Sequence, residues 1–259
     1  MKNKSKENPT CTGRSVKQTL RFLLCIALLL AVPKAGAQDV WDGKPDKSWY
    51  TDDSQEDDGV YHIKTAAELA GMAEPVTGVQ TCALPIYGGY DFCDKTVMLD
   101  ADIVLNETDG WENWGYKAPD GLKEWTPIGT YDSPFSGIFD GQGHTVKGVY
   151  IMRKNYAGLF GYLDGGTIQN VGVVESDISG ANAGGIVGGS SGTIQSCYYT
   201  GTVERSLVAG GIVGNYKNGT VTNCYYLDGC VKGNENKVLG TTPKPAAAFH
   251  NGEVAYLLN

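Results

Sequence analysis

A 26-residue repeat constrains the fold of this chain more than any other feature of its sequence. A short motif of alanine, glycine and apolar residues begins at Ala157, Ala183 and Ala209, and a second motif follows each copy. The first motif occupies 157–161, 183–188 and 209–214, the second occupies 166–171, 192–197 and 219–224, and a shorter forerunner covers 137–141 and 144–149. Of the 36 glycines, 23 lie between Gly137 and Gly240. This regular spacing identifies a repeat protein with four units.

Each unit has apolar positions that indicate bent strands. Runs rich in Val, Ile, Thr and Tyr alternate with Gly, Asn and Ser, as in strands and turns. Two positions three residues apart are apolar in every unit, although a flat strand would place them on opposite faces. Both can face inward if the chain turns between them, at a residue type that accepts a corner conformation. The apolar columns are Val146, Ile168, Ile194, Val221 and Val149, Val171, Cys197, Cys224, and the corner residues are Gly148, Asn170, Ser196 and Asn223.

The repeat therefore predicts an all-β fold, a right-handed parallel β-helix (β-solenoid) with short capping helices. Ordering about 26 residues costs at least ~1 kcal/mol each in backbone entropy. Some five to seven inward apolar residues per coil return roughly 1.5–3 kcal/mol each, so a single unit cannot fold alone. A propeller and a sandwich are the alternatives, but a propeller blade needs about 40 residues. The glycines expected to have a structural role in the repeat are Gly158, Gly161, Gly185, Gly188, Gly211 and Gly214.

The repeat motifs resemble the GLUG-motif repeats of large secreted or surface-bound bacterial proteins. The resemblance covers roughly residues 123–230, including the lead-in stretches 123–129 and 134–148. It implies a β-solenoid at the cell surface or outside the cell. For function it implies less, because the motif occurs in adhesin-like proteins and also beside catalytic domains, including secreted immunoglobulin-cleaving metallopeptidases.

Residues outside the repeat predict an exported protein with capped ends. Residues 1–37 are typical of a signal peptide, because a basic stretch precedes an 11-residue apolar run, 22–32, and the small residues 35–37. A lipoprotein modified at Cys25 is the alternative. An acidic segment is expected over 38–64, a cap helix and first strands over 65–135, the repeats over 136–240, and a helical segment over 241–259 that we expect to be truncated. Thr65 and Glu68 form a capping-box pattern for the first helix, over 65–73, and the early strands are expected at 96–99 and 103–105. The expected location is the cell surface or extracellular space, with the periplasm as the alternative and no membrane insertion after cleavage.

One segment does not suit the fold. Residues Val76–Ile86 match the translation of a common sequencing-library adaptor, so we interpret them as an artefact of the gene model. Without them and the signal peptide, four cysteines remain: Cys93, Cys197, Cys224 and Cys230. Cys197 and Cys224 share a column and are expected to form a buried stack of thiols, with Cys230 the favoured partner if any bridge forms.

Charge and composition exclude several partners and cofactors. Residues 38–259 carry 14 basic against 28 acidic groups, a net charge of −14. Such a body repels nucleic acid and anionic lipid. The three histidines are far apart and lack metal-ligand spacing, so no metal or other cofactor is expected. The acidic cluster at 52–58 is interpreted as a solvated loop, with a calcium site as the alternative.

Aromatic residues are the candidate ligand-binding groups, because flat rings can stack on the apolar faces of sugars. Trp111, Trp114 and Tyr116 crowd one loop together with Trp125, which could instead belong to the core. The pair Tyr198–Tyr199 recurs as Tyr225–Tyr226, and we name Tyr199 and Tyr226 as candidates. The leading hypothesis is a non-catalytic, adhesin-like surface module that binds glycan or extracellular protein.

Two other functions stay open at the level of sequence. A polysaccharide lyase or hydrolase would need acidic and basic side chains on one face. The repeat region offers Arg153, Lys154, Asp164, Glu175, Asp177, Glu204, Arg205 and Asp228. The chain could also be a non-catalytic spacer of a larger secreted metallopeptidase.

Overall fold

The computed structural model describes residues 39–51, 59–74, 92–115, 118–233 and 235–258. Several sequence predictions lie outside these ranges: the signal peptide, the acidic cluster at 52–58, the adaptor-like segment 76–86, and Tyr116. The described part forms one compact unit from Asp39 onward.

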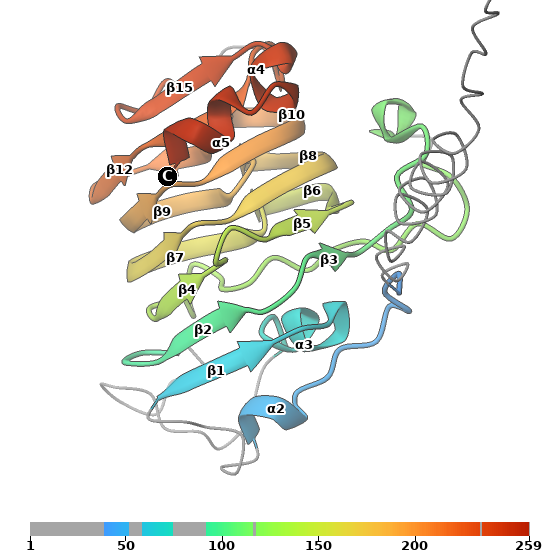
Figure 1. Cartoon of the computed structure of the whole chain (residues 1–259), viewed down its shortest axis with the longest axis vertical. Coiled ribbons are helices and arrows are strands. Elements are labelled where there is room, and N and C mark those ends of the chain that lie inside the picture. Colours follow the sequence, from blue (N-terminus) through green and yellow to red (C-terminus); the bar gives the residue numbers. More distant parts are fainter. Residues whose placement is uncertain (1–38, 52–58, 75–91, 116–117, 234, 259) are drawn as a thin grey trace, which may run out of the picture. The chain divides into compact units, whose positions relative to one another are not determined.

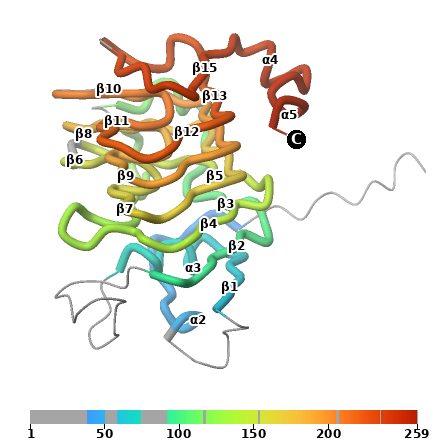
Figure 2. Tube along the Cα trace, turned by 90° about the vertical axis from the view of Figure 1, so that its left-hand side faces the viewer, coloured from blue at the N-terminus to red at the C-terminus, as the bar shows by residue number. Residues whose placement is uncertain are grey.

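Two parallel sheets make up the fold (Figure 1), which confirms the predicted all-β solenoid. Sheet A contains, in order, β1 (Val60–Ile63), β2 (Thr96–Leu99), β4 (Ile138–Asp140), β7 (Phe160–Gln169), β9 (Val187–Gln195) and β11 (Val213–Tyr216), with β12 (Thr220–Thr222) also paired to β9. Sheet B contains β3 (Ile103–Val104), β5 (Thr145–Lys147), β8 (Gly172–Gly184), β10 (Tyr198–Gly210), β13 (Cys224–Leu227) and β15 (Thr241–Lys244), with β6 (Tyr150–Ala157) paired to β8 and β14 (Val231–Lys232) paired to β10. The chain alternates between the sheets and rises by one strand per coil, as Figure 2 shows along the colour ramp. This arrangement is consistent with the expected right-handed winding.

Register between coils places equivalent repeat positions directly beside one another. Ile168 pairs with Ile194, and Ile194 pairs with Val221. These three side chains are 0–6% exposed, so the column forms part of a continuous core. Each coil therefore packs its apolar residues on those of its neighbours, as a repeat that cannot fold alone requires.

The corners between the sheets adopt the left-handed backbone conformation. Asn170, Ser196 and Asn223 have φ of 54°, 51° and 53°. These values reverse the side-chain alternation, so the apolar residues on both sides of each corner point inward. Asn170 Nδ2 also donates to the Asp140 carboxylate at 3.0 Å, which ties its corner to the preceding coil.

The predicted place of the forerunner in these columns was wrong, because Phe139 pairs with Ile168, whereas Val146 pairs with Val173 and Lys147 with Val174. Gly148 (φ of 77°) is therefore a second kind of corner, equivalent to Glu175 (φ of 47°) in the next coil.

Cys197 and Cys224 lie in the core as free thiols, which confirms the predicted stack. Their neighbours Tyr198 and Tyr225 are register partners on β10 and β13. Burial raises the pKa of the Cys197 thiol well above its usual value. Cys230 is also free and buried, whereas Cys93 is disulfide-bonded. The Cys197 thiol is therefore a structural side chain and a poor nucleophile.

A glycine in each later turn accommodates a tyrosine from the same coil. A Cβ atom on Gly211 would lie 2.2 Å from Cγ and Cδ2 of Tyr226. Val173 occupies the same column as Tyr199 and Tyr226, and the turn of its coil, at 158–159, is one residue shorter than the turns at 184–186 and 210–212. The longer turn, with its extra glycine, therefore occurs in the two coils that carry a tyrosine in this column.

Helices and extended segments close the N-terminal end of the stack. The predicted first helix is confirmed as α3 (Ala66–Gly71), with Thr65 and Glu68 forming the capping box and Leu69 fully buried. The early strands are confirmed as β2 and β3. In α2 (Ser48–Thr51), the Trp49 indole donates to the Glu68 carbonyl at 3.0 Å. The backbone N–H of Trp41 donates to the Val104 carbonyl at 3.1 Å, which covers the outer edge of β3.

The solenoid extends beyond both ends of the predicted range, 136–240. It begins at β1, inside the segment assigned as acidic, and it ends at β15, inside the segment assigned as helical. Pro243 had indicated a break, but β15 is the outermost strand of sheet B, where a missing N–H is tolerated. The last helical segment is two helices, α4 (Ala246–His250) and α5 (Glu253–Leu258), separated at Gly252 with φ of 83°. They lie beside the last coils (Figure 2).

The fit between Gly211 and Tyr226 can be tested by a double-mutant cycle. Gly211→Ala forces the new methyl group into the tyrosine ring, and overpacking of this kind costs about 1–3 kcal/mol. Tyr226→Val alone also destabilises, because it leaves a cavity. We expect the double variant to be more stable than the sum of the single losses predicts, by at least about 1 kcal/mol, measured by urea unfolding. Additive losses would contradict the proposed fit.

Candidate functional site

Most of the aromatic residues that the sequence nominated for ligand binding are buried. Trp114, Tyr199 and Tyr226 are 5%, 0% and 3% exposed, so their assignment as exposed binding rings was wrong. Tyr199 points inward because strand residues alternate, and its hydroxyl donates to the Thr202 carbonyl at 2.8 Å. Trp111 is half-buried on the 3-10 helix η2 (Trp111–Asn113).

Tyr198 and Tyr225 are the outward members of the two tyrosine pairs. Both are half-buried on the outer face of sheet B. The Tyr198 ring lies 6.1 Å from the ring of Phe249 on α4. Here α4 and α5 border a half-open cavity of about 410 Å³ against sheet B, called the α5 cavity below. Its lining residues are Gly143, Val174, Glu175, Tyr198, Thr200, Phe249, Val254, Ala255 and Leu258.

Three tyrosines and a lysine form a partly exposed aromatic cluster, which we call the tyrosine cluster: Tyr131, Tyr156, Tyr162 and Lys217. Tyr131 is 55% exposed and stacks nearly parallel to Tyr156, with ring centroids 6.1 Å apart. Tyr162 meets both rings edge-on at 5.2 Å. Lys217 Nζ lies 4.7 Å from the Tyr131 ring centroid and 5.3 Å from that of Tyr162, in cation–π range. Tyr162 is 4% exposed and supports the other rings from below, so the surface open to solvent consists of Tyr131, the half-buried Tyr156 and the Lys217 ammonium group.

Local backbone features place the cluster. Tyr131 sits on a tight turn in which the Thr130 N–H donates to the Ser133 carbonyl at 2.8 Å. Tyr162 on β7 is the register partner of Gly189 on β9. A Cβ atom on Gly189 would lie 2.7 Å from Cε1 of Tyr156 and 2.8 Å from Cδ2 of Tyr162, so this glycine makes room for both rings. Sequence reasoning missed the cluster because Tyr156 and Tyr162, which flank the motif at 157–161, have no tyrosine at the equivalent positions of the next unit, and Tyr131 and Lys217 come from other coils.

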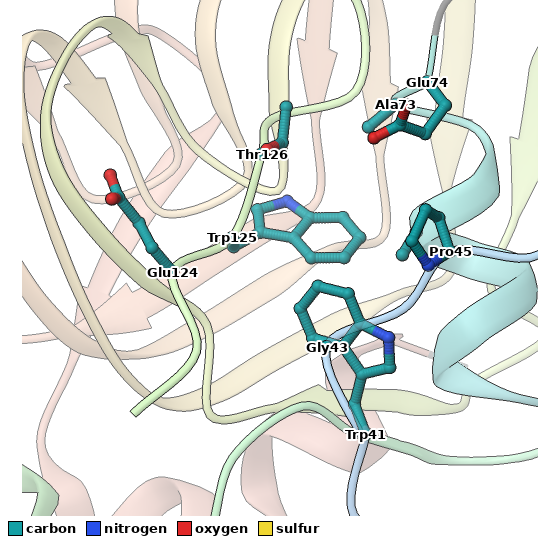
Figure 3. A pocket seen from close by; sticks show the side chains of 9 residues that line it. Trp41, Gly43, Pro45, Ala73, Glu74, Glu124, Trp125 and Thr126 are labelled. Carbon is teal, nitrogen blue, oxygen red and sulfur yellow. The ribbon is translucent and has the colours of Figure 1, made fainter. Parts of the chain in front are cut away.

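A second hollow lies between two tryptophans at the first coils (Figure 3). Its volume is about 140 Å³, and it is lined by Trp41, Gly43, Pro45, Ala70, Ala73, Glu74, Glu124, Trp125 and Thr126. The Trp41 and Trp125 rings meet edge-on at 5.9 Å. Trp125 is 1% exposed and its indole donates to the Leu159 carbonyl at 3.0 Å, so it is a core residue. The hollow is smaller than ordinary ligand pockets of about 300–1,000 Å³.

Charged residues that an enzyme would need are spread over both sheets. Asp164 on β7 accepts a hydrogen bond from Ser191 at 2.7 Å, and Glu175 on β8 pairs with Lys147 at 2.7 Å. Lys154 lies 3.6 Å from Glu124. The side chains of Arg153 and Arg205 lie outside the described part of the chain.

Asp177 is the most buried of these carboxylates, with 9% exposure. It lies on β8 and accepts the backbone N–H of Gly115 at 2.6 Å, beneath the loop that carries Trp114. Burial raises the pKa of the Asp177 carboxyl; the Gly115 hydrogen bond opposes this shift, and the Glu204 carboxylate adds to it.

Neither a metal site nor a membrane span is found in the described ranges. No group of three or more His, Cys, Asp or Glu side chains there could hold a metal ion. No helix among the described residues has the length and apolar character needed to cross a bilayer.

The raised pKa of Asp177 predicts a pH-dependent stability. The folded state binds this proton more tightly than the unfolded state, so stability falls as the pH rises above the unfolded value of about 3.9. Asp177→Asn keeps an acceptor for Gly115 and removes the charge. We expect this variant to unfold at higher urea than the wild type at pH 7, with little difference at pH 3. Asp164→Asn, at an exposed site, is the control; a less stable Asp177→Asn variant at pH 7 would contradict the assignment.

Comparisons with known proteins give one partial likeness. No protein-family model matches the chain, and no solved structure gives a significant match. Over 123 residues, 46% of this chain, it is 34% identical to Halomucin of Haloquadratum walsbyi. The match covers 1% of the length of Halomucin. The chain is thus similar to one short part of a far longer protein.

Proposed function

We propose that this chain is a non-catalytic, exported surface module that binds a glycan through the tyrosine cluster. The observation that carries the proposal is Tyr131, a 55% exposed ring held by Tyr156, Tyr162 and Lys217 on a rigid solenoid. The partial likeness to a much longer protein supports a module within a larger assembly. The proposal includes three predictions made from the sequence: that the repeats are of the GLUG type, that residues 1–37 are a signal peptide, and that the role is adhesin-like.

Chemistry at the cluster suits a sugar. An aromatic ring covers the apolar C–H face of a pyranose, while hydroxyl groups of the sugar need polar partners at its rim. Tyrosine hydroxyls and the Lys217 ammonium group supply such partners, and Asp164 lies two residues after Tyr162 on β7. The preformed cluster loses little side-chain entropy on binding.

Charge favours a neutral glycan over an acidic one. The net charge of −14 over residues 38–259 repels polyanions at a distance. Lys217 is a single exposed cation that is already placed over two rings. We therefore expect neutral polysaccharides to bind more tightly than uronic-acid polymers at low salt.

An extracellular protein ligand is the alternative for the same surface. The lyase or hydrolase alternative lacks a supporting observation, because Asp177 is covered by the Gly115 loop and Glu175 is paired with Lys147.

Replacing Tyr131 tests the proposal. Loss of one aromatic contact of about 1 kcal/mol corresponds to about fivefold weaker binding. We expect Tyr131→Ala to weaken binding to neutral polysaccharides at least about fivefold in affinity electrophoresis. Tyr256→Ala is the matched control, because Tyr256 is 81% exposed on α5, outside the cluster.

Two outcomes would contradict the proposed function. Equal binding by Tyr131→Ala and wild type would show that the tyrosine cluster is not part of the binding surface. Release of new reducing ends or unsaturated products from the polysaccharides would show catalysis.

A further inference from the structure

The α5 cavity has the size of a small-molecule site. Its volume of about 410 Å³ lies within the range of about 300–1,000 Å³ that ligand pockets span. Sheet B forms its floor through Val174, Tyr198 and Thr200, and α4 and α5 form its other wall. Figure 1 shows α5 in front of the strands of sheet B.

Walls of the cavity are largely apolar. Phe249, Val254 and Leu258 contribute from the helices, and Val174 contributes from β8. Val254 is 2% exposed and anchors α5 against the solenoid. The Lys244 ammonium group binds the Glu253 carboxylate at 2.7 Å and fixes the start of α5. The cavity is therefore a preformed feature between two anchored elements.

Two hydroxyl groups lie on the floor of the cavity. Among the residues that the structure describes, neither the Tyr198 nor the Thr200 hydroxyl makes a side-chain hydrogen bond. They lie two residues apart on β10, so both project from the same face of the strand. Burial raises the pKa of the Tyr198 hydroxyl, and the nearby Asp102 carboxylate adds to this shift, so the group stays a protonated donor at neutral pH.

Charge in the cavity is balanced. Glu175 is the one charged residue among the described residues that line the cavity, and Lys147 Nζ lies 2.7 Å from its carboxylate. The Thr108 hydroxyl also bonds this carboxylate. An ionic ligand would lose hydration without gaining a free countercharge, so the cavity favours a neutral molecule.

We propose that the α5 cavity binds a neutral molecule with a single aromatic ring and a polar oxygen, of the phenol or aryl-alcohol class. The ring packs among Phe249, Val254 and Leu258, and the oxygen bonds the hydroxyl groups of Tyr198 and Thr200. This site is separate from the tyrosine cluster, and either can fail without the other.

Three probes separate the two interactions in this proposal, the packing of the aromatic ring and the hydrogen bonds to the polar oxygen. p-Cresol has the ring and the hydroxyl, toluene has the ring alone, and benzoate adds a charge. We expect p-cresol to shift the backbone amide NMR signals of Val174, Thr200 and Val254, and to bind about fivefold or more tightly than toluene. Benzoate is expected to bind more weakly than p-cresol.

Matched variants test the hydroxyl groups without removing apolar packing. Tyr198→Phe is expected to lower the affinity for p-cresol about fivefold and to leave toluene unchanged. Tyr225→Phe is the control, because the Tyr225 hydroxyl bonds Asn223 at 2.8 Å and lies outside the cavity lining. An absence of shifts at the three amides with both p-cresol and toluene, or an equal p-cresol affinity in Tyr198→Phe, would overturn the proposal.

Discussion

Hydrogen bonding between parallel strands of successive coils is the interaction on which the rest of this structure depends. It fixes the register that places Ile168 beside Ile194 and Ile194 beside Val221. Once the register is fixed, apolar side chains of successive coils meet in the same inner columns. A polar residue is accepted there only with a hydrogen-bond partner, as for the fully buried Ser190, which is the register partner of Leu163 and accepts the Gly192 N–H at 3.2 Å. The left-handed corners at Asn170, Ser196 and Asn223 follow from the same constraint, since each coil must turn at the same place.

Stacking also explains how surfaces arise from distant parts of the sequence. Tyr131 and Lys217 are separated by 86 residues along the chain, yet the lysine lies over the tyrosine ring because the coils between them rise by only one strand spacing each. The α5 cavity arises differently. There the chain leaves the solenoid after β15 and folds α4 and α5 back on the outer face of sheet B. One surface is thus built within the stack, and the other where the stack ends.

The fold could be predicted from the sequence because the same pattern of inward apolar residues and corner residues recurs in several units. The corner at Ser196 and the thiol column of Cys197 and Cys224 follow from aligned positions. The choice of Tyr199 as a binding residue was wrong although the same pattern could have corrected it: with Cys197 facing inward after the corner, alternation places Tyr198 outward and Tyr199 inward. The strand at Thr241–Lys244 was missed because Pro243 is unfavourable in a central strand and acceptable only at an edge. The tyrosine cluster left no pattern because its members recur in no column.

Contacts between methyl groups of neighbouring coils test the parallel stack most directly. In a methyl-labelled sample, the stack predicts strong nuclear Overhauser effects between Ile168 and Ile194 and between Ile194 and Val221. It predicts a weak or absent effect between Ile168 and Val221, which are two strand spacings apart, or about 9.6 Å. Strong contacts between Ile168 and Val221, or none between Ile168 and Ile194, would contradict the register from which both proposed sites are built.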